Sequence, residues 1–443
     1  MGFSPRRSVF IIPIYAMRRN IIVSALLLLF ITFAFSCEKK ESPVKVTDEM
    51  ARDTLYDIME YWYYWHDNMP AINKKNYSNP YTLLEALRYD KLDRWSFVAD
   101  YEKFMADMAG EFYGHGFSMG IDEEDNARIA MIYSGSPLYI QGVRRGWIVS
   151  SINGHDIATV IKNGDAYTYN LIFSAPTSAF IFKKPDGTLW ETTSTKSKFT
   201  INTVLEYDTL KLKSGTAGHL VLESFKSSTS AELEEAFDFF RDNNVSDLII
   251  DLRYNSGGYL DVALEMSNYI AGNNLNSEIF SLLRYSDKRS RHNYSYCFGE
   301  TSVPLDVSNI VFITSRATAS ASEALINGLK PFFNIVSVGD TTYGKPMGMD
   351  GWACAEKYIF YPVTFKVVNA QGQGEYFGGL PPEIIGGDDL KHDFNDREEE
   401  CLKYAIEYLE NGTVTAKSEE SRYRPVYMFN RPEWSDNMFT TIP

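Results

Sequence analysis

The segment "ATASASEALINGLKPFFNIVSVGDTTYGKP", from Ala317 to Pro346, decides the fold of this chain. Ser320-x-x-Glu323 is a capping box, a pattern that starts many helices, and it precedes the helix-forming stretch "ALINGLK". The apolar run "NIVSVG" follows as a strand, and Lys345 stands beyond it in the loop "TTYGKP". A helix that leads into a buried strand is typical of an α/β sheet. The returning strand would bring the lysine loop to the end of the sheet where the helix begins.

The segments before it extend the same pattern. "HLVLESF", "DLIIDL" and "NIVFIT" are predicted strands, and the last two are continuous apolar runs of the kind found in sheets covered on both faces. Between the first two, Thr229 and Glu232 form a second capping box, ahead of a helix with apolar residues at i, i+3, i+4 and i+7. We therefore expect an α/β core domain over residues 201–412 and a C-terminal tail over residues 413–443.

Two regions of different character precede the core. Residues 37–110 are predicted to be helical, and their aromatic run "LYDIMEYWYYWHDNMP" is more typical of core or inter-domain packing than of a ligand cage. Residues 111–200 alternate short strands with turns, among them Asn153-Gly154, a dipeptide typical of tight hairpin turns. The sequence thus predicts an N-terminal helical region followed by a β-rich domain.

The first 36 residues read as a targeting segment. "MRRN", which begins at Met17, is basic, and "IIVSALLLLFITFAFS" leads to Cys37 but is shorter than the roughly 20 residues of a membrane span. This arrangement resembles a bacterial lipoprotein signal, so we expect residues 1–36 to be removed and Cys37 to be acylated. The protein would then lie in the cell envelope, anchored by lipid to the outer membrane on its periplasmic or surface-exposed face. An uncleaved anchor helix, and a start at Met17, remain alternatives.

Composition excludes several classes of partner. The formal net charge of −15 argues against nucleic acid, because the phosphate backbone would repel an acidic chain. Beyond Cys37 the cysteines are Cys297, Cys354 and Cys401, and no C-x-x-C pair occurs, so we expect no metal site. One disulfide and buried free thiols are both open.

Ser320 is the first candidate nucleophile, although a capping serine needs no catalytic role. None of the six histidines lies near it in the sequence. Lys345 is the alternative base, because a desolvated lysine can lose its proton and then accept that of a serine. The turn Gly257-Gly258, after the strand "LIIDL", can present a backbone N–H to an oxyanion, or it can be a simple turn that requires glycine.

A second candidate is the segment Gly116-Phe117-Ser118-Met119-Gly120, which matches the G-x-S-x-G elbow of esterases and lipases. The elbow requires a strand before the serine and a helix after it. Here a helix-like stretch comes before the serine and the strand-like "ARIAMIY" comes after it. The context is reversed, so the sequence disfavours an esterase.

Three motifs together resemble a known family. "IIDLRYNSGG", "ATASASEALINGL" and "TTYGKP", in this order, are similar to the hallmarks of the C-terminal processing peptidases, also called tail-specific proteases. "GSPLYIQGVRRGWIVSSINGHDI" resembles the PDZ domain of that family, and "FGGLPPEI" resembles its closing segment. The resemblance extends over most of the chain after the signal. It implies a ClpP/crotonase-like α/β core with an inserted or preceding PDZ-like domain.

The resemblance also implies roles for individual residues. Ser320 would be the nucleophile, Lys345 the general base and Glu323 a supporting residue, while the backbone N–H groups of Gly258 and Ala321 would form the oxyanion hole. The expected activity is that of a serine endopeptidase with a Ser-Lys dyad and no cofactor.

The same resemblance assigns "YGHGFSMGI" to a carboxylate-binding loop. Gly116, Phe117, Ser118, Met119 and Gly120 would then bind the C-terminal tails of protein or peptide substrates, which would add as a strand to the domain edge.

The chain departs from the family pattern at two positions. Pro346 replaces a frequent second glycine, and Met349 replaces a glutamine that contacts the lysine in many members. We expect activity to be retained despite both departures. The alternative function is a catalytically silent, peptide-binding lipoprotein of the same fold.

Overall fold

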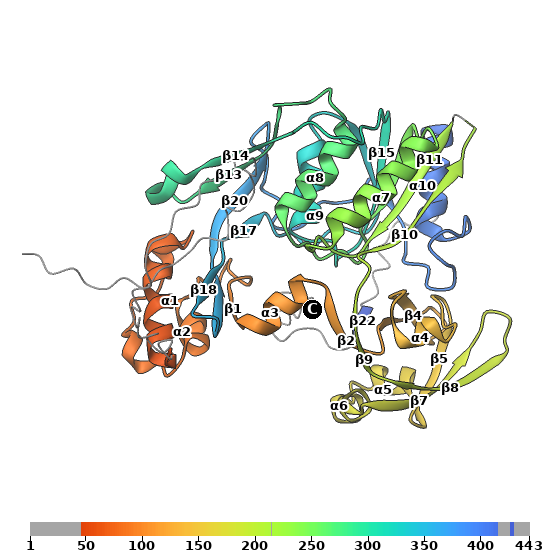
Figure 1. The fold of residues 1–443 in the computed structure, drawn as a ribbon, viewed down its shortest axis with the longest axis horizontal. Coiled ribbons are helices and arrows are strands. Elements are labelled where there is room, and N and C mark those ends of the chain that lie inside the picture. The colour runs from red at the N-terminus through yellow and green to blue at the C-terminus, as the bar shows by residue number, and fades with distance from the viewer. Residues whose placement is uncertain (1–45, 214, 415–425, 429–443) are drawn as a thin grey trace, which may run out of the picture. The chain divides into compact units, whose positions relative to one another are not determined.

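The computed structural model describes residues 46–213, 215–414 and 426–428, and its chain forms two compact units (Figure 1). Among the described residues, unit 1 contains 46–102 and 349–363, and unit 2 contains the rest. The predicted signal peptide and Cys37 lie outside the described residues. Within the part that is described, no helix has the length and apolar character needed to cross a membrane.

Unit 1 combines the predicted N-terminal helices with a small sheet. Helix α1 (Asp48–Trp62) begins at Thr47, whose side chain accepts a hydrogen bond from the backbone N–H of Met50, and α2 (Pro80–Leu87) follows. The sheet has the antiparallel order β1-β19-β18, with bounds β1 (Phe97–Asp100), β19 (Tyr358–Tyr361) and β18 (Trp352–Cys354). The helical prediction is wrong at β1, because its ladder partner comes from a distant part of the chain that a local pattern does not reveal.

Aromatic side chains of the run in unit 1 pack inside that unit, as predicted. Tyr63 is fully buried and donates a hydrogen bond to Asp93 over 2.7 Å. The ring of Trp62 lies 5.8 Å from that of Trp352, measured between centroids. These contacts tie α1 to the small sheet.

Unit 2 is built on a six-stranded sheet of order β10-β11-β12-β15-β16-β21, in which β10 is antiparallel and the other strands are parallel. The predicted strands are all present. Their bounds are β10 (Val204–Lys211), β11 (Thr216–Leu222), β12 (Asp247–Asp251), β15 (Asn309–Thr314), β16 (Asn334–Gly339) and β21 (Ile384–Ile385).

Helices cover both faces of this sheet, which explains the continuous apolar strands. On β12, Leu248 and Ile250 pack in the cluster formed with α7 (Thr229–Asp242), α8 (Leu260–Ala271) and α9 (Ala321–Leu329). Ile249, between them, packs in the cluster formed with α10 (Glu400–Asn411). Because side chains alternate along a strand, a strand covered on both faces is apolar at successive positions, as Leu248, Ile249 and Ile250 are in the middle of β12.

The start of α7 differs from its prediction. Thr229 is the first helical residue and its hydroxyl donates to the carbonyl of Ser224, while Glu232 accepts a hydrogen bond from the backbone N–H of Val204 over 2.7 Å. The predicted capping box is therefore wrong, because both side chains find partners outside the helix.

Residues 111–200 form a separate sheet with its own apolar core. The strand order is β22-β3-β4-β5-β7-β8, with β6 beside β5, and β2 pairs with β9 in a two-stranded ladder. The Asn153-Gly154 turn joins β5 to β6 with positive φ at both residues, as predicted. The strand bounds are β2 (Glu111–Gly114), β3 (Phe117–Ile121), β4 (Ala127–Ile132), β5 (Ile148–Ile152), β6 (His155–Asp156), β7 (Thr177–Lys183), β8 (Leu189–Thr195), β9 (Ser197–Thr200) and β22 (Val426–Met428).

The remaining elements complete the chain. A further sheet has the order β14-β13-β20-β17. The outstanding bounds are α3 (Tyr101–Met108), α4 (Pro137–Ile140), α5 (Ile157–Lys162), α6 (Ala166–Ser174), β13 (Ile279–Tyr285), β14 (Tyr294–Cys297), β17 (Met347–Met349) and β20 (Val363–Asn369).

Candidate active site

Ser320 stands at the start of α9, just beyond the carboxyl end of β15. It has φ 57° and ψ −113°, a backbone conformation that residues with a side chain rarely adopt. Such strain costs about 1–3 kcal/mol and is found mostly where function requires it. The residue is only half-buried.

Glu323 explains how this strained start is held. Its side chain is completely buried and accepts four hydrogen bonds. Oε2 accepts from the backbone N–H of Ser320 over 2.9 Å and from that of Lys345 over 2.8 Å. Oε1 accepts from the backbone N–H of Gly344 over 2.7 Å and from the hydroxyl of Thr342 over 2.5 Å. Burial raises the pKa of Glu323, and the four donors oppose that rise.

The shared oxygen brings the predicted serine and lysine segments together. Ser320 and Lys345 each place a backbone nitrogen within hydrogen-bonding distance of the same atom, Oε2 of Glu323. Lys345 is 6% exposed, so its side chain lies almost entirely out of water. Beyond it, the carbonyl of Pro346 accepts a hydrogen bond from the N–H of Val367.

The predicted closing segment "FGGLPPEI" supports the lysine loop. Thr342 and Leu380 exchange two hydrogen bonds, one to the Leu380 carbonyl and one to the Thr342 hydroxyl. A side chain at Gly344 would lie 2.4 Å from the carbonyl oxygen of Phe377, and one at Gly379 would lie 2.1 Å from that of Thr342. Both glycines are required because the two backbones approach too closely for any other residue.

The turn after β12 packs directly against Ser320. A Cβ atom at Gly257 would lie 2.8 Å from the Cβ of Ser320, and one at Gly258 would lie 2.2 Å from the carbonyl oxygen of Phe225. Among the described residues, the N–H groups of Gly258 and Ala321 have no hydrogen-bond acceptor. These two donors are therefore available beside the serine.

Asn255 was quoted in the sequence motif without a role, and the structure assigns it a positioning one. Its carbonyl accepts hydrogen bonds from the Ala319 N–H over 3.1 Å and from the Ser322 hydroxyl over 3.0 Å. Its side-chain Oδ1 accepts from the N–H of Gly257 over 2.9 Å. One buried residue thus joins the glycine turn to both sides of Ser320. Only its place inside "DLRYNSGG" could have indicated this.

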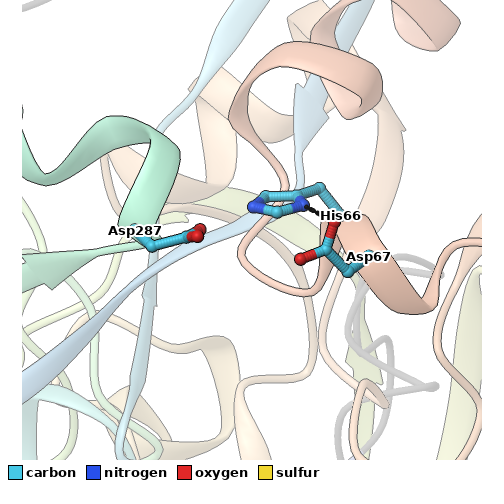
Figure 2. A group of neighbouring side chains, drawn as sticks. All are labelled: His66, Asp67 and Asp287. Carbon is cyan, nitrogen blue, oxygen red and sulfur yellow. Dashed lines mark ion pairs between the residues drawn. The ribbon is translucent and has the colours of Figure 1, made fainter.

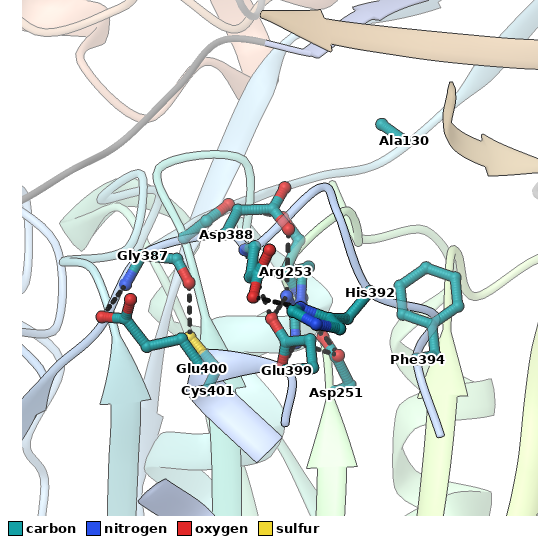
Figure 3. Close-up of polar contacts among 12 residues, drawn as sticks. Ala130, Asp251, Arg253, Gly387, Asp388, His392, Phe394, Glu399, Glu400 and Cys401 are labelled. Carbon is teal, nitrogen blue, oxygen red and sulfur yellow. Dashed lines mark hydrogen bonds and ion pairs between the residues drawn. The ribbon is translucent and has the colours of Figure 1, made fainter. Parts of the chain in front are cut away.

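The "DLR" part of the same motif is anchored in a buried charge network (Figure 3). Arg253 pairs with Asp251 over 2.8 Å, with Glu399 over 2.6 Å and with Asp388 over 3.0 Å. Asp388 also pairs with Arg145, from the 111–200 region, over 3.0 Å. Burial disfavours the charge on Asp388, but the two arginines hold its pKa below the usual value. The network fixes the strand end from which the glycine turn departs.

Several histidines of unit 2 form polar contacts with residues other than Ser320. His292 accepts a hydrogen bond from the side chain of Arg291 over 3.2 Å. His115 contacts the hydroxyl of Ser194 over 3.0 Å, and His219 contacts Oδ1 of Asn395 over 2.9 Å. His392 forms an ion pair with a nearby aspartate in the same loop. Lys345, whose backbone N–H shares Oε2 of Glu323 with that of Ser320, remains the candidate base.

In unit 1, His66 pairs with the adjacent Asp67 over 2.9 Å (Figure 2). Cys297 is exposed, and Cys354 and Cys401 are buried; all three are free thiols.

The G-x-S-x-G segment has no elbow. Ser118 lies inside strand β3, is completely buried, and is followed by strand β4 rather than by a helix. Its hydroxyl has no hydrogen-bond partner among the described residues. Gly116 and Phe117 stand where the loop enters β3, and Met119 and Gly120 continue along the strand.

Comparison with protein families agrees with this geometry. The model of peptidase family S41 matches residues 216–385, and the model of the peptidase S41 N-terminal domain matches residues 51–97. The first match includes Gly258, Ser320 and Lys345, and the second includes α2 and all but the first turn of α1.

Individual relatives are distant. A Staphylococcus saprophyticus protein assigned as a CtpA-like serine protease is 24% identical over 341 residues, which cover 77% of this chain and 65% of the relative. The carboxyl-terminal-processing protease of a Picosynechococcus strain is 24% identical over 262 residues, which cover 59% of this chain and 61% of that protein. The matched part of this chain thus spans less than two thirds of the length of either relative.

A solved structure shows the same fold. A Bacteroides fragilis protein assigned as an S41 protease superimposes with a TM-score of 0.68 at 22% identity, over 82% of this chain and 98% of that one. The mixed α/β architecture with an N-terminal helical region is that of S41 proteases. The chain therefore belongs to peptidase family S41, the family of the C-terminal processing peptidases.

Proposed function

We propose that this protein is a serine endopeptidase that uses Ser320 and Lys345 as a catalytic dyad. The observation that carries the proposal is the buried carboxylate of Glu323, which accepts hydrogen bonds from the backbones of both residues. A strained serine at a helix start, a nearly buried lysine and two unused N–H donors are the parts that acyl transfer requires.

The reaction would proceed in two steps. Ser320 Oγ attacks the scissile carbonyl carbon, its proton passes to the neutral amine of Lys345, and the ammonium then protonates the leaving amine of the substrate. In the second step water attacks the acyl carbon and gives one proton to Lys345. The bond between that carbon and Ser320 Oγ then breaks, and the ammonium returns the proton to Oγ, which releases the acid and restores the serine and the neutral lysine. The N–H groups of Gly258 and Ala321 would stabilise the oxyanion in both steps, aided by the positive end of the α9 dipole.

Substrate choice would come from the 111–200 sheet. In this proposal the sheet is a PDZ-like domain beside a ClpP/crotonase-like core, and the tail of a substrate adds as a strand to the edge of β3. Gly116 opens the loop at the start of β3 with φ +77°, a conformation that lets successive backbone N–H groups face one carboxylate. The substrates would be proteins with apolar C-terminal tails, met in the cell envelope by an enzyme anchored through Cys37.

The test is cleavage of an unfolded reporter that ends in an apolar tail. The form lacking residues 1–37 should cleave it, while Ser320→Ala and Lys345→Ala should each lose at least about a thousandfold in kcat/KM. Circular dichroism and thermal melting of both variants should match the parent, which excludes loss of fold as the cause.

One further variant separates the alternatives. Ser118→Ala keeps the backbone of β3 and should cleave normally; loss of activity there would favour the esterase-type serine instead. A parent that binds tail peptides and cleaves none of them would refute the dyad and favour a silent binding protein.

A further inference from the structure

The C-terminal segment of the chain occupies an edge of the 111–200 sheet. Strand β22 (Val426–Met428) pairs antiparallel with β3, and the sheet order places it outside β3. Among the described residues, β3 has β4 on one side and only β22 on the other. Without β22, the outer row of N–H and C=O groups of β3 would be an open edge.

The direction of β22 is that of a bound tail. Val426 lies opposite Gly120, Tyr427 opposite Met119 and Met428 opposite Ser118. The chain of β22 therefore runs toward the start of β3 and the glycine loop that precedes it. A substrate tail whose carboxylate reaches that loop must run along β3 in the same direction.

The N–H and C=O groups on the outer edge of β3 can form ladder hydrogen bonds with only one strand at a time. A strand has two hydrogen-bonding edges, and β4 already uses the inner edge of β3. A tail and β22 would thus compete for the same outer edge. The sequence Val-Tyr-Met is itself apolar and β-forming, so it has the character expected of a ligand for this site.

We propose that β22 is a built-in pseudo-ligand that covers the tail-binding edge and must be displaced before a substrate tail can bind. This inference rests on the proposed function, in which the outer edge of β3 receives the tail. The strand is only three residues long, so its own pairing is weak. Its attachment to the same chain, after α10 ends at Asn411, raises its effective concentration to the order of millimolar.

The test measures binding without catalysis. The probe is a fluorescein-labelled peptide of the chain's own sequence "YRPVYMFN", residues 423–430, with a free carboxylate. The host is the full chain carrying Ser320→Ala, so that the probe is not cleaved. Tyr427→Pro removes a backbone N–H from the centre of β22 and should open the edge. Glu420→Pro makes the same change outside β22 and is the matched control.

We expect fluorescence anisotropy to show that Tyr427→Pro binds the probe about tenfold more tightly than the host. This factor is the one expected if β22 leaves the edge of β3 free in about one tenth of the host molecules, because the apparent affinity is reduced by that fraction. Hydrogen exchange at residues 117–121 should become faster in Tyr427→Pro and slow again when the probe is added. The Glu420→Pro control should match the host in both measurements.

A second variant guards against misfolding. A chain that stops after Val414 keeps all of α10 and removes β22, and it should bind the probe as tightly as Tyr427→Pro does. If neither variant binds more tightly than the host, or if both only lower the melting temperature, β22 is a structural strand and the inference is wrong. Because no step requires cleavage, this result is independent of whether the parent proves to be a peptidase.

Discussion

The two serines that the sequence offers as candidate nucleophiles lie in completely different structural settings. Ser118 lies between two glycines in a strand, fully buried, with its hydroxyl unused by any described residue. Ser320 lies at a helix start with positive φ, half-buried, and its backbone is held by Glu323. The five-residue pattern G-x-S-x-G matches Ser118, but both the sequence context and the surrounding elements favour Ser320.

The difference shows what makes a serine usable as a nucleophile. A serine inside a strand directs its side chain to one face of a sheet. In β3 the neighbours Phe117 and Met119 pack in the apolar core of this domain, so Ser118 faces the other side of the strand, where it is also completely buried. A serine at the junction of a strand and a helix has free N–H donors beside it and the end of the sheet in front of it. Four substitutions would break or sharpen this contrast.

The largest effect is expected from crowding the Ser320 site. Gly257→Ala would place a methyl group 2.8 Å from the Cβ of Ser320, at a position where φ is +106°. Displacement of the serine by a few tenths of an ångström should lower kcat about 100-fold or more, with a smaller change in KM. Gly142→Ala is the matched control, since its φ is +95° and nothing lies within 4 Å of the new methyl group. Equal loss in both variants would show that strain, and not contact with Ser320, is responsible.

Glu323→Gln should have the next largest effect. In the parent, each carboxylate oxygen of Glu323 accepts hydrogen bonds from two donors. In the glutamine variant, the NH2 group replaces one of these oxygens, so two donors lose their acceptor whichever way the amide is turned. We expect kcat to fall about 10- to 100-fold and the free energy of unfolding to fall by about 2–4 kcal/mol. Glu232→Gln, on α7, also alters a glutamate that accepts a backbone N–H, and it should leave kcat unchanged. Unaltered kinetics in Glu323→Gln would mean that the shared carboxylate does not position the dyad.

The stability of the fold is expected to depend on pH through His115, which directly precedes the loop at the start of β3. Burial, and to a lesser extent the charge of Lys196, lowers the pKa of His115 from 6.5 to about 4. Between these values the unfolded chain binds the additional proton and the folded one does not, so the stability contributed by neutral His115 is present above pH 6.5 and is lost as the pH falls toward 4.

Urea unfolding at pH 7 and pH 5 measures this effect. The parent should lose stability at the lower pH, and His115→Gln should lose less, whereas the exposed His155→Gln should behave like the parent. If His115→Gln shows the full pH dependence of the parent, another group is responsible.

Ser118→Ala should have the smallest effect. Removal of a buried hydroxyl that has no described partner changes stability by less than about 1 kcal/mol, and it can stabilise the fold. Thermal melting and reporter cleavage should both remain close to those of the parent. A loss of several kcal/mol would indicate that the hydroxyl has a partner, such as a bound water molecule.

Local patterns were sufficient for most of the fold. The apolar runs of β12, β15 and β16, the Asn-Gly turn and the helix that follows Ser320 depend on neighbouring residues, so periodicity and capping predicted them. Local patterns failed at β1, whose partner β19 is distant in the sequence, and at Glu232, whose acceptor oxygen is used by Val204.

The sequence by itself determined which residues could form the candidate site, because Ser320, Glu323, Lys345 and the glycine turn each belong to a short motif with its own local conformation. Only the tertiary structure decided that one carboxylate oxygen joins Ser320 to Lys345, that Asn255 ties the turn to the serine, and that β22 covers β3. Each of these contacts depends on the path of the folded chain between the motifs. Residues that are far apart in the sequence can form these hydrogen bonds only after the sheets have folded and brought their segments within a few ångströms of each other.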